Sequence, residues 1–296
     1  IKDAIKNGSK IIITDKFKTH VIKKKILFLK VKNPRNLLAK FSSKIFNKKP
    51  NNLIAVTGTN GKSSIANFYF QILTINRIKS ASIGTLGVSG LKIKKNYFNT
   101  TFDTIQINKI LKKLKEKKIE NVILEASSHG LNQNRLDGLK FDIGIFTNLT
   151  RDHLDYHKTF KNYFNSKLIL FRKLLKKKSY AIYDEELKIS SNLNRITKSN
   201  KIKKFTLGNT KSSFTIIDHQ FLKDEQKITF RFNNKKYSFS TKLIGRVQIK
   251  NLLMAIMAAM KSKIPLEKIL KSTQKIKSVN GRLEKIGNLY NNGIVI

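Results

Sequence analysis

Residues 57–64 read Thr-Gly-Thr-Asn-Gly-Lys-Ser-Ser, which has the residue types and spacing of a loop that binds phosphate. Gly58 and Gly61 would let the backbone approach a ligand closely, and a helix that begins after Gly61 would direct N–H groups at an anion. Lys62 would neutralise phosphate charge and Ser63 would bind Mg²⁺. The strict pattern has a further glycine upstream, so this segment is a variant phosphate loop; the alternative is a tight turn with an incidental Lys-Ser pair.

Lys167 lies at a position where the amphipathic pattern of residues 160–176 predicts an apolar residue. With 100° per residue along a helix over 160–176, six apolar side chains lie within roughly 60° of it. These are Phe160, Tyr163, Phe164, Leu170, Phe171 and Leu174. A desolvated lysine has a lowered pKa and a neutral amine that can act as a base, form a Schiff base or capture carbon dioxide as a carbamate. The alternative is a lysine whose stem packs while its ammonium reaches water.

Polar side chains follow two further apolar runs of the chain. Glu125 lies at the end of the run 122–126, and His153 comes shortly after the run 143–147. Because the carboxyl ends of parallel strands meet at one edge of a sheet, we expect both residues to lie near the phosphate loop. A carboxylate and an imidazole are both plausible ligands of Mg²⁺. Either residue alone could instead be a surface or capping residue.

The order of apolar and amphipathic segments predicts the elements that position these residues. From residue 52, short apolar runs alternate with amphipathic stretches, which predicts an α/β fold with a central, mostly parallel sheet. The predicted strands are residues 53–57, 81–84, 122–126, 143–147 and 180–183. The predicted helices are residues 62–75, 104–118, 160–176, 247–261 and 266–276. Alternating apolar and polar residues over 214–243, around Asn233 and Asn234, predict an antiparallel hairpin at the sheet edge.

The composition excludes several classes of protein. The chain has 296 residues, of which 40% are hydrophobic, so it can fill a real core. The 61 Lys and Arg against 18 Asp and Glu give a net charge of +43, but the surplus is spread along nearly the whole chain, which favours solvated lysine faces over a nucleic-acid site. There is no cysteine, and no apolar run approaches the roughly 20 residues that span a bilayer. We therefore expect a cytoplasmic protein that binds neither nucleic acid nor a membrane.

Taken together, these motifs resemble the Mur ligase family, and most closely its MurE type. The resemblance covers most of the chain and rests on residues 57–64, 84–87, 99–101, 125–129, 134–135, 147–157, 167 and 281–284. The phosphate loop is also shared with folylpolyglutamate synthases. The Asn-Thr-Thr, Ser-Ser-His and Arg-Asp-His-Leu-Asp-Tyr-His segments are more specific to the MurE type.

The resemblance implies an ATP-dependent amide ligase of peptidoglycan precursor synthesis, and hence a role in cell shape and division. ATP would phosphorylate the D-Glu carboxylate of UDP-MurNAc-L-Ala-D-Glu, and a diamino acid, meso-diaminopimelate, would attack the acyl phosphate. The catalytic residues would be Lys62, His153 and a carbamylated Lys167. The Mg²⁺ ligands would be Ser63, Glu125, His153 and Lys167. The ATP contacts would be Thr57, Gly58, Thr59, Asn60, Gly61, Lys62, Ser63, Ser64, Asn251 and Arg282. The muramyl dipeptide contacts would be Thr100, Thr101, Ser127, Gln133 and Arg135.

The resemblance also implies a domain organisation. Residues 1–50 would be part of an N-terminal UDP-binding domain, residues 51–296 the central ATP-binding domain, and the C-terminal domain that binds the amino acid would be missing. We therefore expect a monomer with little or no turnover by itself. One alternative is a folylpolyglutamate synthase-type ligase, which residues 99–101 and Arg135 disfavour. The other is a basic phosphate-loop ATPase that binds nucleic acid.

Overall fold

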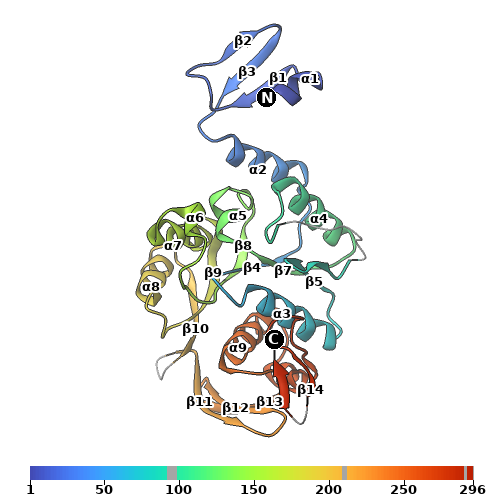
Figure 1. Cartoon of the computed structure of the whole chain (residues 1–296), viewed down its shortest axis with the longest axis vertical. Coiled ribbons are helices and arrows are strands. Elements are labelled where there is room, and N and C mark those ends of the chain that lie inside the picture. Colours follow the sequence, from blue (N-terminus) through green and yellow to red (C-terminus); the bar gives the residue numbers. More distant parts are fainter. Residues whose placement is uncertain (92–98, 209–211, 290–291, 296) are drawn as a thin grey trace.

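The computed structural model describes residues 1–91, 99–208, 212–289 and 292–295, and within them ten strands form one large sheet (Figure 1). In order across the sheet, the strands are β13 (Lys235–Thr241), β12 (Gln226–Phe232), β11 (Phe214–Phe221), β10 (Lys203–Gly208), β9 (Leu175–Asp184), β8 (Phe141–Phe146), β4 (Asn52–Thr57), β7 (Asn121–Glu125), β5 (Ser80–Gly84) and β6 (Gly87–Ser89). The strands from β11 to β5 pair in parallel, whereas β12, β13 and β6 run antiparallel to their neighbours. The predicted α/β class with a mostly parallel sheet is therefore confirmed.

Helices cover both faces of this sheet because its central strands are apolar on both sides. In β4, Ile54 and Val56 enter one buried cluster, and Leu53 and Ala55 enter the other. The first cluster is covered by α3 (Lys62–Ile75), α9 (Arg246–Met260) and α10 (Leu266–Ser272). The second is covered by α4 (Thr104–Glu116), α5 (Ser128–Asn132), α7 (Phe160–Ile169), the π-helix η1 (Leu170–Leu174) and α8 (Ser190–Ser199). Among the helices in the described ranges, none has the length and apolar character needed to cross a bilayer.

The N-terminal residues form a small sheet of their own, in the order β1-β3-β2, at one end of the molecule (Figure 1). Its elements are α1 (Lys2–Lys6), β1 (Ile11–Thr14), β2 (Val21–Lys23) and β3 (Ile26–Lys30). Helix α2 (Pro34–Ile45) follows and packs against α4. The remaining short elements are α6 (Leu154–His157), η2 (Thr273–Lys275), β14 (Lys285–Leu289) and β15 (Asn292–Val295).

The clearest difference from the predicted elements lies in the helix predicted over residues 160–176. The α-helix ends at Ile169, a π-helical turn follows, and strand β9 begins at Leu175. Leu175 pairs with Phe141 of β8, so the chain has already joined the sheet where the helix was expected to continue. The edge hairpin is confirmed, with Phe232 pairing with Lys235 across the Asn-Asn turn. Residues 214–221 add one further strand to it, and α8 and β10 were not predicted.

Candidate active site

The phosphate loop follows β4, which lies between β7 and β8 at the point where the strand order reverses. Open parallel sheets bind their ligands at such a point. The segment after β8 holds the loop in place. The Thr59 N–H donates to the Asn148 carbonyl (3.0 Å), the Asn60 N–H to Asn148 Oδ1 (2.9 Å), and the Thr150 N–H to Thr59 Oγ1 (3.0 Å). The loop conformation is therefore fixed by the neighbouring strand end.

Two positions in the loop admit only glycine. Gly58 has φ +146°, and an added Cβ would lie 1.8 Å from Thr147 Oγ1. Gly61 has φ +86°, and its Cβ would lie 2.6 Å from Asn251 Oδ1. The second contact brings Asn251, which the resemblance implied as an ATP contact, directly against the loop from helix α9.

Glu125 and Ser63 meet beside the loop. Glu125 is 2% exposed, its Oε2 accepts from Ser63 Oγ (3.0 Å), and its Oε1 accepts from the Thr85 N–H (2.9 Å). Burial raises the pKa of the Glu125 carboxyl, while the nearby Lys62 ammonium opposes the rise. A buried carboxylate and a hydroxyl are hard oxygen donors of the kind Mg²⁺ binds in phosphate sites. The residues present therefore fit a Mg²⁺ ion.

These groups line a cavity of about 290 Å³. The implied ATP contacts that line it are Thr59, Asn60, Gly61, Lys62, Ser63, Ser64 and Arg282. Arg282 comes from a distant segment, and its carbonyl accepts from Gln248 Nε2 (2.8 Å) on α9. Thr57 does not line the cavity and instead ends β4, with its carbonyl accepting from the Thr147 N–H (2.9 Å).

Two lysine side chains converge on one carbonyl of the phosphate loop. Lys167 Nζ donates to the Gly58 carbonyl (2.6 Å), and Lys62 Nζ donates to the same oxygen (3.1 Å) and to the Thr59 carbonyl (2.7 Å). Lys167 is 1% exposed, and its ammonium lies 4.3 Å from the centre of the Tyr163 ring. Burial, together with the charge of Lys62, lowers the pKa of Lys167 to about 6. The amine of Lys167 is therefore mostly neutral at pH 7.

The aromatic ring of Tyr163 lies near both Lys167 and His153. The Tyr163 ring lies 6.2 Å from the His153 ring and 5.4 Å from the His157 ring. His153 itself is exposed, with φ +52°. Burial lowers the pKa of His157 to about 4, so this imidazole is neutral. Sequence reasoning missed Tyr163 and His157 as site residues, although Tyr163 belongs to the same apolar stripe as Lys167. No three His, Asp or Glu side chains in the described ranges are grouped closely enough to hold a metal by themselves.

The two threonines implied in substrate binding both lie near Glu125, and Thr100 lines the cavity at the phosphate loop. Thr101 is buried, and its Oγ1 donates to the Glu125 carbonyl (2.8 Å). Thr85 Oγ1 donates to Thr100 Oγ1 (3.1 Å) and also contacts the Glu125 carboxylate (3.3 Å). Thr85 thus connects the Glu125 carboxylate to Thr100, and sequence reasoning gave it no role.

The other three implied substrate residues surround Thr101. Arg135 Nη1 donates to the Thr101 carbonyl (2.5 Å), and its Nη2 donates to Gln133 Oε1 (2.8 Å). The Ser127 N–H donates to Thr101 Oγ1 (2.9 Å). The structure therefore brings all five implied substrate residues to one place, next to the cavity at the phosphate loop.

Replacing Gly84 by alanine is expected to displace the Glu125 carboxylate, because the added Cβ would lie 2.1 Å from Glu125 Oε1. We expect a loss of about 1–3 kcal/mol in the free energy of unfolding and roughly tenfold weaker binding of Mg²⁺ with an ATP analogue. Chemical denaturation and calorimetry measure the two effects. Gly87→Ala is the control, because nothing lies within 4 Å of its added Cβ, so only its backbone at φ +84° is strained. Equal nucleotide binding in both variants would contradict this role of Gly84.

A phosphate loop at the switch point of a parallel sheet, with a buried carboxylate beside its serine, defines an α/β phosphate-loop domain. The Mur ligase middle domain matches residues 56–259. The chain belongs to the Mur ligase family.

Several relatives that share one ligase name match nearly the whole chain. The UDP-N-acetylmuramoyl-L-alanyl-D-glutamate–2,6-diaminopimelate ligase of Rickettsia montanensis is 38% identical, in an alignment that covers 97% of this chain and 60% of that relative. The ligase of the same name from Agrobacterium fabrum is 31% identical over 99% of this chain and 59% of its own length. A solved structure of a ligase with this name matches with a TM-score of 0.83 at 25% identity, over 97% of this chain and 58% of that chain. The chain thus spans about 60% of the length of these relatives.

More distant structures share only the fold. An FPGS–AMPPCP complex matches with a TM-score of 0.68 at 15% identity, over 89% of this chain and 72% of that chain. The sequence-based assignment to the Mur ligase family and its MurE type is confirmed, and the folylpolyglutamate synthase alternative has the weaker support.

Proposed function

We propose that this chain carries the ATP-binding part of a cytoplasmic ligase that adds meso-diaminopimelate to UDP-MurNAc-L-Ala-D-Glu in peptidoglycan precursor synthesis. The observation that carries the proposal is the position of Glu125. Its side chain bonds to Ser63 beside the phosphate loop, and its backbone carbonyl accepts from Thr101, which the resemblance implies in substrate binding. One residue therefore joins a nucleotide site to a second site, as transfer of phosphate between two substrates requires. The names of the relatives supply the identity of the substrates.

The nucleotide would lie with its phosphates over the loop. Residues 62–64 at the start of α3 line the cavity, and Lys62 would turn from the Gly58 and Thr59 carbonyls to the γ-phosphate. Ser63 and Glu125 would hold Mg²⁺, which supplies charge neutralisation at the transferring phosphate. Asn251 and Arg282 would contact the rest of the nucleotide from the α9 side.

The muramyl dipeptide would bind along Thr100, Thr101, Ser127, Gln133 and Arg135. The Arg135 guanidinium presents a rigid fork that suits a carboxylate. With the D-Glu carboxylate directed at the loop, its oxygen would attack the γ-phosphorus of ATP, the bond from that phosphorus to the β,γ-bridging oxygen would break, and ADP would leave an acyl phosphate. The neutral amine of the diamino acid would then attack the acyl carbon, and loss of phosphate and of the amine proton would give the peptide bond. Lys62 would stabilise the charge that builds up on the phosphoryl oxygens.

Lys167 would act as a carbamate. Its amine is mostly neutral at pH 7, as addition to carbon dioxide requires, and its position against the Gly58 carbonyl places it at the phosphate loop. The product would carry a negative charge beside the Lys62 side chain, and with His153 it would bind a second Mg²⁺. We further propose that residues 1–50 belong to the UDP-binding domain, that residues 51–296 form the central domain, and that the ligase acts as a monomer.

Calorimetric titration of UDP-MurNAc-L-Ala-D-Glu, with Mg²⁺ and AMP-PCP present, tests this function. We expect saturable binding that Arg135→Ala weakens by about 10–100-fold, because a charge-assisted, two-pronged contact is lost. Arg135→Lys keeps the charge but not the fork and should bind with intermediate affinity.

Arg195→Ala is the matched control, since Arg195 is an exposed arginine on α8 away from the site. A folded chain that binds AMP-PCP but not the muramyl dipeptide would reduce the proposal to an ATP domain. Binding of a folate in its place would support the folylpolyglutamate synthase-type ligase.

A further inference from the structure

Tyr156 lies beside the residues implied in substrate binding, although the resemblance implied no role for it. It belongs to the short helix α6, and the centre of its ring lies 4.2 Å from that of His129 and 4.7 Å from that of His157. Its hydroxyl donates to Asn132 Oδ1 (3.0 Å) and accepts from Gln133 Nε2 (3.2 Å). One hydroxyl therefore connects the segment after β8 to the end of helix α5.

The Tyr156 hydroxyl determines which way the Gln133 amide points. A tyrosine hydroxyl has one hydrogen, and here Asn132 Oδ1 accepts it. Toward Gln133 the hydroxyl can therefore act only as an acceptor, so it binds the NH₂ end of that amide. The Gln133 oxygen faces the other way, where it accepts from Arg135 Nε (3.2 Å) and Nη2 (2.8 Å). A reversed amide would direct its NH₂ group at the guanidinium, which has no acceptor.

Arg135 keeps two N–H groups for a ligand. A guanidinium has five N–H groups. Two of them donate to Gln133, and a third, on Nη1, donates to the Thr101 carbonyl (2.5 Å). Nη1 and Nη2 each retain one N–H that has no partner among the described residues. These two nitrogens can bind both oxygens of a carboxylate, provided that the plane of the guanidinium stays fixed.

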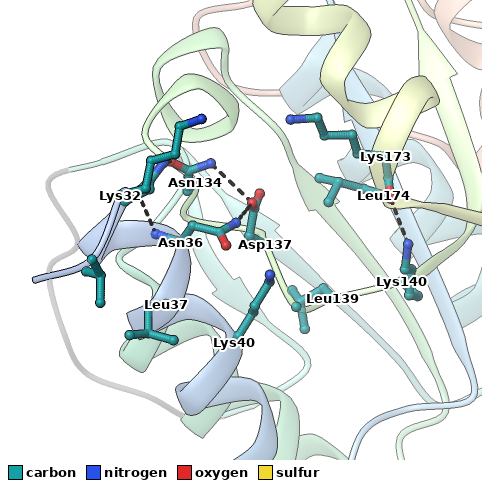
Figure 2. A pocket seen from close by; sticks show the side chains of 13 residues that line it. Lys32, Asn36, Leu37, Lys40, Asn134, Asp137, Leu139, Lys140, Lys173 and Leu174 are labelled. Carbon is teal, nitrogen blue, oxygen red and sulfur yellow. Dashed lines mark hydrogen bonds between the residues drawn. The ribbon is translucent and has the colours of Figure 1, made fainter.

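The turn that follows helix α5 is held independently of Tyr156. Asn134, whose φ is +59°, donates from Nδ2 to Asp137 Oδ2 (3.1 Å), and Asn36 of helix α2 donates to the same oxygen. Figure 2 shows the side chains of Asn36 and Asn134 directed at Asp137. Loss of the Tyr156 hydroxyl should therefore leave the turn in place and release only the side chain of Gln133.

We propose that Tyr156 is a positioning residue of the muramyl dipeptide site, which acts on a substrate carboxylate through Gln133 and Arg135. The inference rests on the function proposed above, in which the Arg135 fork binds a carboxylate of D-Glu. By fixing the Gln133 amide, Tyr156 holds the guanidinium in the plane in which Nη1 and Nη2 both reach that carboxylate. The substrate then binds without first ordering the Arg135 side chain. Tyr156 does not line the cavity at the phosphate loop, so nucleotide binding does not depend on it.

Calorimetric titration of the full chain and its Tyr156→Phe variant with UDP-MurNAc-L-Ala-D-Glu, in the presence of Mg²⁺ and AMP-PCP, tests the proposal. The variant keeps the ring and loses only the hydroxyl, so we expect about fivefold weaker binding of the dipeptide. AMP-PCP alone should bind within about twofold of the wild-type affinity. Tyr183→Phe is the matched control, because Tyr183 of β9 also donates to an asparagine oxygen, Asn194 Oδ1 (2.8 Å), on helix α8. It should bind both ligands like the wild-type chain.

Two further measurements distinguish positioning from a general loss of structure. In a chain that carries Arg135→Ala, the addition of Tyr156→Phe should change dipeptide affinity by less than about twofold, because the hydroxyl acts only through Arg135. An analogue in which both D-Glu carboxylates are amides should bind to the wild-type chain and to Tyr156→Phe with affinities within about twofold of each other. The full loss of affinity in either experiment would overturn the proposal, since the hydroxyl would then act on the fold and not on the carboxylate.

Asn132 tests the direction of the hydrogen bonds. Asn132→Ala frees the Tyr156 hydrogen to turn to Gln133 and should weaken dipeptide binding by about two- to fivefold. Asn132→Asp keeps an acceptor at this position and should restore binding to within about twofold of the wild-type affinity. Equal binding by Asn132→Ala and the wild-type chain would overturn the series of bonds on which the proposal depends.

The proposed function and this inference fail in different ways. If the wild-type chain binds the dipeptide and Tyr156→Phe binds it equally well, the role of Tyr156 is overturned and the proposed function stands. If a folded wild-type chain does not bind the dipeptide, both are overturned.

Discussion

Replacing Lys167 by methionine is expected to raise the free energy of unfolding at pH 7 by about 3 kcal/mol. Lys167 is 1% exposed, and burial together with Lys62 lowers its pKa from 10.5 to about 6. Methionine has a similar shape and no charge to desolvate. The Gly58 carbonyl keeps its hydrogen bond from Lys62 in the variant. The fold should therefore be more stable without the amine.

The pH dependence of this gain identifies its cause. Between about pH 6 and pH 10.5 the unfolded chain holds a proton on Lys167 and the folded chain does not, so the stability of the wild-type protein rises with pH across this range. The gain from Lys167→Met is then largest below about pH 6, shrinks through the range, and disappears near pH 10.5. Urea unfolding at several pH values measures it. Lys161→Met, at an exposed position of the same helix, should show no such trend, and a parallel trend in both variants would contradict the assignment.

Lys167→Met also tests whether Lys167 is carbamylated. Intact-mass measurement under native conditions with bicarbonate should detect the addition of one carbon dioxide to the wild-type chain and its loss on acidification. Lys167→Met should show no addition. An identical adduct on the variant would place the modification on another lysine.

The position of Lys167 shows what the sequence could and could not predict. Its place in an apolar stripe predicted burial, and the structure confirms that the side chain is buried. The stripe could not predict that its ammonium reaches the Gly58 carbonyl, because that contact joins residues 109 positions apart. Nor could the 100° spacing reveal the π-helical turn at η1, after which the chain pairs with β8.

The sequence did not predict several residues of the site, and one physical reason explains this. Polar residues at strand ends predicted one edge of the sheet as the site, and the parallel pairing of β4 with β7 and β8 brings Glu125 and the 147–150 segment there. Strand order across the sheet is a tertiary property, so the contacts of Asn148 and Thr85 with the site could not be read from local spacing. Helix α8 was not predicted, although its pattern is amphipathic and buries Leu193, Ile196 and Thr197 at helical spacing.

Replacing Glu125 by glutamine is expected to remove the dependence of nucleotide binding on Mg²⁺. Glutamine preserves the shape and can keep the bonds to Ser63 and Thr85, but it lacks the charge that a hard cation requires. For the wild-type chain we expect Mg²⁺ to tighten AMP-PCP binding by about 100-fold, and for Glu125→Gln by less than about threefold. Calorimetry with and without Mg²⁺ measures both. Glu116→Gln, which alters an exposed ion pair on α4, is the control.

The stability of Glu125→Gln tests whether the Glu125 carboxylate is present for metal binding or for the fold. Burial raises the pKa of Glu125 above 4.5, so the folded chain holds a proton that the unfolded chain has lost, and wild-type stability falls as the pH rises through the raised pKa. Without a metal, Glu125→Gln should therefore be the more stable protein at pH 7. A less stable variant with unchanged Mg²⁺ dependence would make Glu125 a structural residue. The charged forms of Lys167 and Glu125 have opposite signs, and burial of either group is expected to destabilise the fold. At Glu125 a bound Mg²⁺ would offset this destabilisation. At Lys167 the addition of carbon dioxide would offset it.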